Sequence, residues 1–467
     1  MYEENGVYAR DSDGFVLVRI RLSFGQPIDS FMDRFTSGWA DAWAAQLNKD
    51  TQWAESAKSW KWSVLIRIQD QSSWVLDLYK GACRSIRQAE PGESADFILS
   101  ADAATWNRIL DGEQAPMVAI MQGAVKLEKG SILTLGRFAK SATLMLEAAM
   151  RVDGPPAETP LPVAVQPVGG DGEAGSAGSE HHVSFRTTSG RGLDHDSLPM
   201  QLYQKAKKLG IWDPRNLDMS ADRGHWEALT DPERDVLTRL LAMFQAGEEA
   251  VTLDLLPLMR ALAMDGRLEE EIYLTTFLFE EAKHVEFFQR IFEEVVMLDA
   301  DLSHFHTPSY KQLFYEELPL AMNRLDTDAS SEALIAASVT YNMVVEGTLA
   351  ETGYQAFYSV LEDRGIMPGV TEGIRLLQRD ESRHIAFGVH LISRLINENP
   401  NLMGVFQNRM ADLMPLAMAS ITELFACYDP MPFGLKEEDF VQFAMDQFGK
   451  RMRRIEQVPT SGQLTSE

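Results

Sequence analysis

Apolar residues recur at helical spacing through most of the second half of the chain. From residue 231 to residue 455 they fall at steps of three and four with polar positions between them, which indicates amphipathic helices that pack against one another. Thr230-Asp-Pro-Glu233 is a capping box with proline in the first turn, and it marks the start of the first long helix. The helices are expected over residues 231–263, 267–298, 331–363, 369–397, 402–428 and 436–455. The pattern predicts an all-α helical bundle with short connections.

The first 151 residues follow a different pattern, in which short alternating or β-branched runs are separated by Gly, Ser and Asp. Such runs are typical of strands in an antiparallel sheet. The strands expected are 63–69, 74–80, 82–88, 96–100 and 124–128, and the helices expected are 29–48, 101–112 and 131–151. An α+β domain is therefore predicted ahead of the bundle.

A segment rich in Pro, Gly and Ala separates the two regions. It contains Gly154-Pro-Pro-Ala-Glu-Thr-Pro and Gly169-Gly-Asp-Gly, which cannot bury a core. Seven of the nine Trp residues precede it, so the composition also changes there. The organisation predicted is a domain over 1–151, a flexible linker over 152–186 and a helical domain over 187–460.

Composition narrows the classes of protein that fit. A chain of 467 residues is too long for one small core, and its net charge of -26 argues against a nucleic-acid partner, which requires a basic face. No apolar run of about 20 residues predicts an integral membrane span, and the N-terminus lacks the pattern of an export signal. Cys83 and Cys427 lie far apart and are expected to be free thiols of a reducing cytoplasm.

Two Glu-x-x-His motifs lie one hundred residues apart, each inside a predicted helix: Glu281-Ala-Lys-His284 and Glu381-Ser-Arg-His384. One such motif is a weak signal, but here each follows a helix that carries a further glutamate. Four glutamates and two histidines on four helices form the ligand set for two metal ions in a bundle. The ligands predicted are Glu248, Glu281, His284, Glu346, Glu381 and His384.

Helix phase supports this choice of carboxylates. Glu248 interrupts the apolar stripe that contains Phe244 and Val251, whereas Glu249 falls off it and is expected to be solvated. Glu280 is likewise expected not to be a ligand. An unpaired buried charge costs several kcal/mol, and two cations would balance four carboxylates. Carboxylate and imidazole donors without Cys suit iron or manganese, and a pair of such redox ions can activate O2.

Several motifs between residues 190 and 455 resemble the ligand-binding oxidases related to the ribonucleotide reductase small subunit, which have a ferritin-like bundle. The motifs are Gly192-Leu-Asp-His-Asp-Ser-Leu-Pro199, Trp226-Glu-Ala-Leu-Thr-Asp-Pro-Glu-Arg234, Gly247-Glu-Glu-Ala-Val-Thr252, Phe279-Glu-Glu-Ala-Lys-His284, Ser338-Val-Thr-Tyr-Asn342 and Asp380-Glu-Ser-Arg-His384. The resemblance implies a mixed Mn and Fe site (or two Fe ions) with O2 as the oxidant, and a long-chain fatty acid bound through its carboxylate. A homodimer through the helical bundle is also expected.

The same resemblance assigns roles to individual residues. It implies that Glu248, Glu281 and His284 bind manganese and that Glu346, Glu381 and His384 bind iron, with Glu281 and Glu381 able to bridge. It also implies an ether bond between a valine and a tyrosine, at the positions of Val251 and Tyr341. Tyr341 lies five residues before Glu346, about 140° away in α-helical phase, so its approach to the metals rests on the resemblance alone.

The first domain also resembles a known family over roughly residues 28–151. Phe97-Ile-Leu-Ser-Ala-Asp102, Leu110-Asp-Gly-Glu113 and Met121-Gln-Gly-Ala-Val-Lys-Leu-Glu-Lys-Gly130 are similar to the C-terminal half of sterol carrier protein type 2 domains. That resemblance implies a sheet covered by helices that encloses an apolar tunnel for acyl chains or sterols. On composition alone, the aromatic and Met content of this domain favours a plain core over a ligand pocket.

The hypothesis is an O2-activating dimetal-carboxylate oxidoreductase fused to a lipid-binding domain. One alternative is a radical-generating ribonucleotide reductase small subunit. Such a subunit generally stores its radical on a Tyr four residues after the first motif's His, where this chain has Phe288, and residues 456–467 offer no aromatic relay to a large subunit. Another alternative is a lipid carrier whose metal bundle is catalytically silent.

Overall fold

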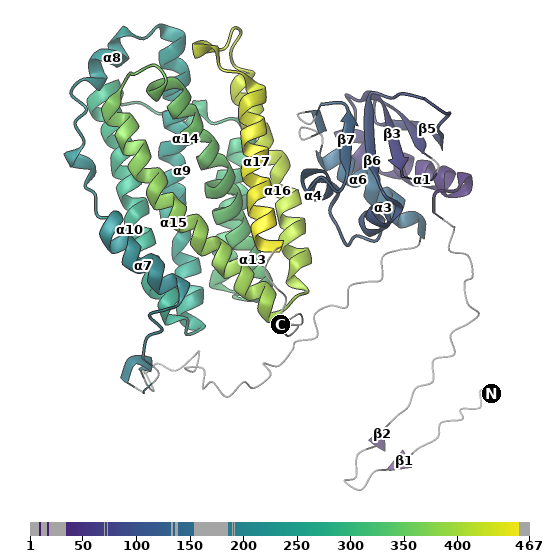
Figure 1. Cartoon of the computed structure of the whole chain (residues 1–467), viewed down its shortest axis with the longest axis horizontal. Helices are drawn as coiled ribbons and strands as arrows, with labels where there is room; N and C mark the ends of the chain where they lie inside the picture. The colour runs from purple at the N-terminus through teal and green to yellow at the C-terminus, as the bar shows by residue number, and fades with distance from the viewer. Residues whose placement is uncertain are drawn as a thin grey trace, which may run out of the picture.

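The computed structural model describes residues 9–10, 16–17, 34–69, 71, 73–131, 134–135, 139–153, 185–188, 190 and 192–456. These residues form a smaller mixed domain and a larger helical bundle (Figure 1). Most of the linker expected over 152–186 lies outside the described residues. So does most of the first 33 residues, where the two-residue strands β1 (Ala9–Arg10) and β2 (Val16–Leu17) pair antiparallel.

Five strands of the first domain form one sheet in the order β5-β4-β3-β6-β7. They are β3 (Lys61–Ile68), β4 (Trp74–Tyr79), β5 (Ala82–Gln88), β6 (Phe97–Ala101) and β7 (Lys126–Lys129). Val64 of β3 lies opposite Leu76 of the antiparallel β4 and opposite Phe97 of the parallel β6. The sheet is mixed rather than wholly antiparallel, because the chain leaves β5 at one edge and returns on the far side of β3.

Helices pack on this sheet and bury a core rich in tryptophan. They are α1 (Ser37–Lys49), α2 (Thr51–Ser56), α3 (Ala103–Leu110), α4 (Pro116–Met121) and α6 (Ala139–Met150). The six-residue helices α2 and α4 were not expected from the sequence. Six indole side chains are at most 3% exposed: Trp39, Trp43, Trp53, Trp60, Trp74 and Trp106.

The second domain is a bundle whose long helices follow the predicted ranges closely. These are α9 (Asp231–Met264), α10 (Leu268–Arg290), α15 (Pro368–Glu398), α16 (Leu402–Phe425) and α17 (Glu437–Glu456). The predicted capping box opens α9, with the Thr230 backbone N–H donating to Glu233 Oε2 at 2.9 Å. Shorter elements that were not predicted are α7 (Leu198–Leu209), α8 (Asp222–Ala228), α11 (Pro308–Lys311), η6 (Gln312–Glu317) and α12 (Leu318–Asn323).

The predicted helix 331–363 is one continuous rod that changes its winding several times. It consists of α13 (Ser331–Ser338), the π-helix η8 (Val339–Ala350), α14 (Glu351–Phe357) and the π-helix η9 (Tyr358–Glu362). A further π segment, η4 (Ile291–Val296), extends α10. Among the described residues, the rod 331–362 is long and apolar enough to cross a membrane by length and composition, and 83% of its most apolar window is buried inside the protein.

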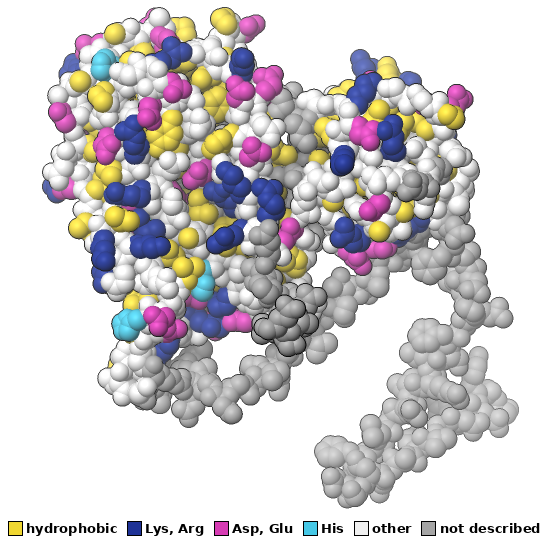
Figure 2. Space-filling model, viewed as in Figure 1, with side chains coloured by type: hydrophobic (Ala, Val, Ile, Leu, Met, Phe, Trp, Pro, Cys, Tyr) yellow, Lys and Arg dark blue, Asp and Glu magenta, His cyan; other side chains and the backbone are white. Residues whose placement is uncertain are grey.

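Charged side chains of both signs are interspersed over the face shown in Figure 2. Most of the acidic excess therefore requires no special role, because a charged carboxylate in contact with water carries no desolvation penalty. Carboxylates that are removed from water need a compensating partner, and one group of them lies at the centre of the bundle.

Candidate metal centre

The six predicted ligands come together between four helices of the bundle. Glu248 is on α9, Glu281 and His284 are on α10, Glu346 is on η8, and Glu381 and His384 are on α15. Their exposure is between 0% and 5%. In each Glu-x-x-His motif a separation of three residues places both side chains on the inward face of the helix.

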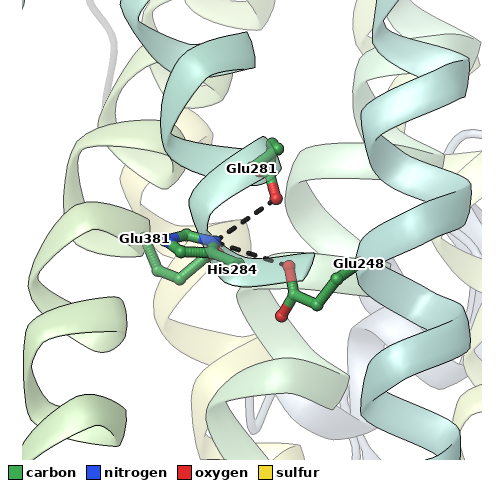
Figure 3. A group of neighbouring side chains, drawn as sticks. All are labelled: Glu248, Glu281, His284 and Glu381. Carbon is green, nitrogen blue, oxygen red and sulfur yellow. Dashed lines mark ion pairs between the residues drawn. The ribbon is translucent and has the colours of Figure 1, made fainter. Parts of the chain in front are cut away.

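Four of these side chains form a first group around His284. Its Nδ1 atom lies 3.4 Å from carboxylate oxygens of Glu248, Glu281 and Glu381. Figure 3 shows Glu248 and Glu281 pointing toward the imidazole from two neighbouring helices. The ligand atoms of this group all lie within 4.8 Å of one another, which is the spacing of donors around one cation.

A second group forms around His384. Its Nδ1 atom lies 3.1 Å from Glu281 Oε1, 3.5 Å from Glu381 Oε2 and 3.7 Å from Glu346 Oε1. Glu281 and Glu381 belong to both groups. The arrangement is therefore two adjacent cation sites that share two carboxylates.

The donor atoms fit a pair of metal ions. Among the described residues, no hydrogen-bond partner is present for Glu281 Oε2, Glu346 Oε1, Glu381 Oε2, His284 Nδ1 or His384 Nδ1. Buried polar atoms are almost always satisfied in folded proteins, so five such atoms facing one another indicate a missing ligand. Oxygen and imidazole donors in this ratio suit iron or manganese.

The pKa shifts of the clustered side chains also indicate that cations are missing from the site. Burial raises the pKa of Glu248 to about 8, and burial with the charge of Glu381 raises the pKa of Glu346 well above its usual range. Burial disfavours the charged form of His284 too, but surrounding carboxylates outweigh it and raise the pKa of that imidazole. The metal-free cluster therefore holds protons, which incoming cations would displace.

A second layer of charged residues orients the two histidines, and the sequence analysis missed it. Glu280, on the helix of His284, accepts from His384 Nε2 at 2.9 Å. Asp380, on the helix of His384, lies 3.5 Å from His284 Nε2. Each motif thus supplies the acid that faces the other motif's histidine. Glu280 belongs to neither candidate ligand group, but it is 1% exposed and has this separate role.

The two outer acids are neutralised by basic residues that immediately precede the histidines. Arg383 Nη2 donates to Glu280 Oε1 at 2.5 Å and to Asp380 Oδ1 at 2.6 Å, and Lys283 Nζ donates to Asp380 Oδ2 at 2.9 Å. The Trp212 indole donates to the same Asp380 oxygen at 2.7 Å. The sequence contains a signal for this layer, because both motifs read acid, Glu, any residue, base, His.

Val251 and Tyr341, the two residues predicted from resemblance to be joined, lie beside the cluster. The Tyr341 hydroxyl lies 3.2 Å from the Val251 carbonyl oxygen and 3.5 Å from Glu281 Oε1. An α-helix would turn Tyr341 away from Glu346, but both residues lie in the π-helix η8. Its i→i+5 hydrogen bonding brings residues five apart close to the same side of the helix.

An apolar cavity of about 1100 Å³, including its open mouth, leads to the cluster. Glu248, Glu281, Glu346 and Glu381 line its inner end together with Val251. Its wall continues along α9 as far as Val236, twelve residues before Glu248, which is about 18 Å of helix. The cavity is long and almost wholly lined by apolar side chains, as a site for an extended hydrocarbon would be.

Comparison with known proteins agrees with this geometry. Residues 196–457 match the family "Ribonucleotide reductase, small chain", and residues 42–139 match the SCP-2 sterol transfer family. Similar solved structures include an R2-like ligand-binding oxidase with aerobically reconstituted metal cofactor after photoconversion, at 40% identity and a TM-score of 0.57. A mutant of R2-like ligand-binding oxidase with anaerobically reconstituted Mn/Fe cofactor has 41% identity and a TM-score of 0.56. Each alignment covers 59% of this chain and 98% of the solved chain. The chain therefore belongs to the ribonucleotide reductase small chain family, among the R2-like ligand-binding oxidases, and it carries an SCP-2 domain ahead of its ferritin-like bundle.

Proposed function

We propose that the bundle is a dimetal-carboxylate oxidase that uses O2 and holds one Mn and one Fe ion. The observation that carries this proposal is the pair of overlapping ligand groups that share Glu281 and Glu381. Glu248 and His284 complete the group proposed for manganese, and Glu346 and His384 complete the group proposed for iron. The Mn/Fe cofactor of the similar oxidases supports the mixed pair, and two iron ions are the other pair that the donors suit.

The metal pair supplies redox electrons for the reduction of O2, and the protein's own residues prepare the site for it. The four glutamates would hold the ions as carboxylates, after giving up the protons that the metal-free cluster holds. Glu280 accepts from His384 Nε2, and Asp380 lies 3.5 Å from His284 Nε2, so these two acids favour the orientation in which the other nitrogen of each histidine faces the metals. The apolar cavity limits the access of water to the inner end.

We propose that this cavity holds a long-chain fatty acid with its carboxylate toward the metal site. The four glutamates at the inner end require cations, and a fatty carboxylate can bind those cations directly. The chain of the ligand would then follow the apolar wall along α9. Extraction of the purified protein followed by mass spectrometry should release a stoichiometric fatty acid, and an empty protein purified from lipid-replete cells would contradict this part of the proposal.

We further propose an ether bond between the Val251 side chain and the Tyr341 hydroxyl oxygen. Its formation removes one hydrogen from a side-chain carbon of Val251 and one from the Tyr341 hydroxyl, and the two electrons and two protons pass to O2. The supporting observation is the 3.2 Å separation of the Tyr341 hydroxyl from the Val251 carbonyl oxygen, both beside Glu281. Intact mass should fall by two hydrogens after metal loading and exposure to O2, and an unchanged mass would refute the bond.

Metal content tests the ligand assignment separately from the chemistry. Glu281→Ala removes a shared carboxylate and should abolish stoichiometric binding of both ions, and His384→Ala should abolish binding in its own group. Glu249→Ala is the matched control, because Glu249 is exposed on the same helix as Glu248. Retention of two ions by Glu281→Ala would mean that the ligands are misassigned.

The alternative of a radical-generating reductase subunit receives no support from the residue at the radical position. Phe288 is fully buried and stacks on Phe244, with ring centroids 5.2 Å apart. It carries no hydroxyl that could be oxidised to a stable radical. O2 consumption by the metal-loaded protein distinguishes the oxidase from the other alternative, a silent metal bundle in a lipid carrier.

We propose that the SCP-2 domain binds a lipid in its own apolar cavity. That cavity has a volume of about 270 Å³ including its open mouth, so a lipid would have to widen it, and it lies between the sheet and helices α1, α3 and α6. Its lining includes Trp39, Trp43, Trp74 and Trp106. Binding of an acyl chain or a sterol there should change tryptophan fluorescence, and no change with either class would contradict the assignment.

A further inference from the structure

The short helix α4 of the SCP-2 domain belongs to two cores at once. Ala119 is fully buried in the core of its own domain. Val118, the preceding residue, is also fully buried, but it belongs to the core cluster of the helical bundle, and Ala115 packs against the same cluster. Figure 1 shows α4 on the side of its domain that faces α16 and α17. The two domains therefore share apolar contacts across the junction.

Burial of Val118 depends on the bundle. Val118 packs in the core cluster of the bundle and not in that of its own domain, so separation of the domains would remove part of its burial. Helix α16 contacts both α4 and α6, so the junction involves two helices of the first domain.

A chain of amides continues the junction at its polar edge. Gln114 Nε2 donates to Gln122 Oε1 at 2.7 Å, and Gln122 Nε2 in turn donates to Glu456 Oε1 at the end of α17. Gln407 of α16 donates to the same Glu456 oxygen at 3.3 Å. Burial raises the pKa of the Glu456 carboxyl, and the two amides partly offset this. A half-buried carboxylate thus receives one of its donors from the other domain.

The contacts described across the junction are apolar contacts and amide hydrogen bonds. Salt screens the attraction between exposed charges but does not weaken apolar contacts, so the junction should tolerate high salt.

We propose that the SCP-2 domain is a docked partner of the oxidase bundle, held by α4 against α16 and α17, and that this contact persists without the covalent linker. The two docking helices also form part of the wall of the bundle's cavity, through Ile421 of α16 and Phe440 of α17. The SCP-2 domain is thereby fixed to two helices that also reach the cavity, with Gln407 and Glu456 of the junction toward the other ends of those helices. Its apolar site and the oxidase cavity stay at a constant separation within one molecule.

Cleavage of the linker in the intact protein tests the proposal. A protease site inserted between residues 154 and 184 allows the folded chain to be cut, after which the two fragments should co-elute in size-exclusion chromatography at low micromolar concentration and in high salt. Val118→Glu should separate them, whereas Ala82→Glu, on the exposed edge strand β5, should not. Separation of the unsubstituted fragments, or co-elution of the Val118→Glu fragments, would overturn the proposal.

A second pair of variants addresses the polar edge. Gln122→Ala should weaken association of the cut fragments about tenfold, since a hydrogen bond to a charged group is lost, while Gln88→Ala at the far end of β5 should leave it unchanged. Hydrogen exchange on the uncut chain provides a readout that does not need cleavage. Val118→Glu should accelerate exchange in residues 402–412 of α16 but not in the core of the SCP-2 domain. Faster exchange throughout that core would indicate unfolding, and unchanged exchange in α16 would contradict docking.

Discussion

Replacing Glu280 by glutamine tests whether Glu280 supports the histidine of the other Glu-x-x-His motif, His384. Glu280 is 1% exposed, and its carboxylate accepts from His384 Nε2 at 2.9 Å and from Arg383 at 2.5 Å. Glutamine keeps the shape of the side chain but loses the charge that makes His384 a stronger metal ligand. Loss of such a partner typically weakens metal binding 10- to 100-fold, which is about 1.4–2.7 kcal/mol.

The effect should be confined to one of the two ions. His384 belongs to the group with Glu346, whereas His284 in the other group faces Asp380. Glu280→Gln should therefore lose one ion to a chelator at a concentration that leaves the second ion bound. Asp380→Asn should weaken the His284 group instead, since its carboxylate faces that imidazole.

Elemental analysis after dialysis against graded chelator measures both outcomes. Glu249→Gln is the control, because it removes an exposed carboxylate one residue from Glu248 without touching the cluster. A thermal unfolding scan of each metal-free variant separates weaker binding from loss of the fold. If Glu280→Gln lost both ions together, or lost neither, the assignment of Glu280 to His384 would be wrong.

Three further predictions concern stability. Glu248 alone should make the free energy of unfolding of the metal-free protein fall by up to about 1.4 kcal/mol per pH unit between pH 5 and pH 8, because native Glu248, with a pKa of about 8, keeps a proton that the unfolded chain has released. The raised pKa values of Glu346 and His284 act in the same direction. Urea unfolding should show stability falling with pH, and bound manganese should flatten the slope; a flat metal-free profile would contradict the prediction. Gly388→Ala should lower the free energy of unfolding by roughly 1–3 kcal/mol, because an added Cβ would lie 2.3 Å from Asn342 Cβ. A free energy of unfolding equal to that of the wild type would disprove the clash. Phe277→Ala should lower the free energy of unfolding by about 3–5 kcal/mol in the same assay, because that ring is fully buried and stacks on the His384 imidazole with ring centroids 3.6 Å apart. Phe279→Ala is the control: its side chain is 53% exposed, and the change should be less than about 0.5 kcal/mol.

The convergence of the six side chains was predictable because its signal is local. A Glu-x-x-His motif on a helix presents both side chains to one face, whatever the rest of the fold does. An acidic residue on an apolar stripe, such as Glu248, needs a counter-charge in any packed bundle. The repetition of this pattern over four helices left few arrangements other than convergence on a shared centre.

The position of Tyr341 was not predictable from helical periodicity. Extrapolation with 3.6 residues per turn turns it away from Glu346, and residues 331–363 contain no Pro that would indicate a change of winding. The π-helical winding of η8 reflects the packing of the whole rod in the bundle. The resemblance supplied the residue, and the tertiary structure supplied the reason that it can reach the site.

The amino-acid sequence by itself determined the two-domain order, the long helices and the six side chains of the metal cluster, since these follow from spacing and from the cost of burying charge. Only the tertiary structure decided which acid faces which histidine, because Glu280 and Asp380 act across two helices that are remote in sequence. It also decided that Val118 is buried in the other domain's core. Contacts of this kind depend on how separate elements meet, and no periodicity within one element encodes them.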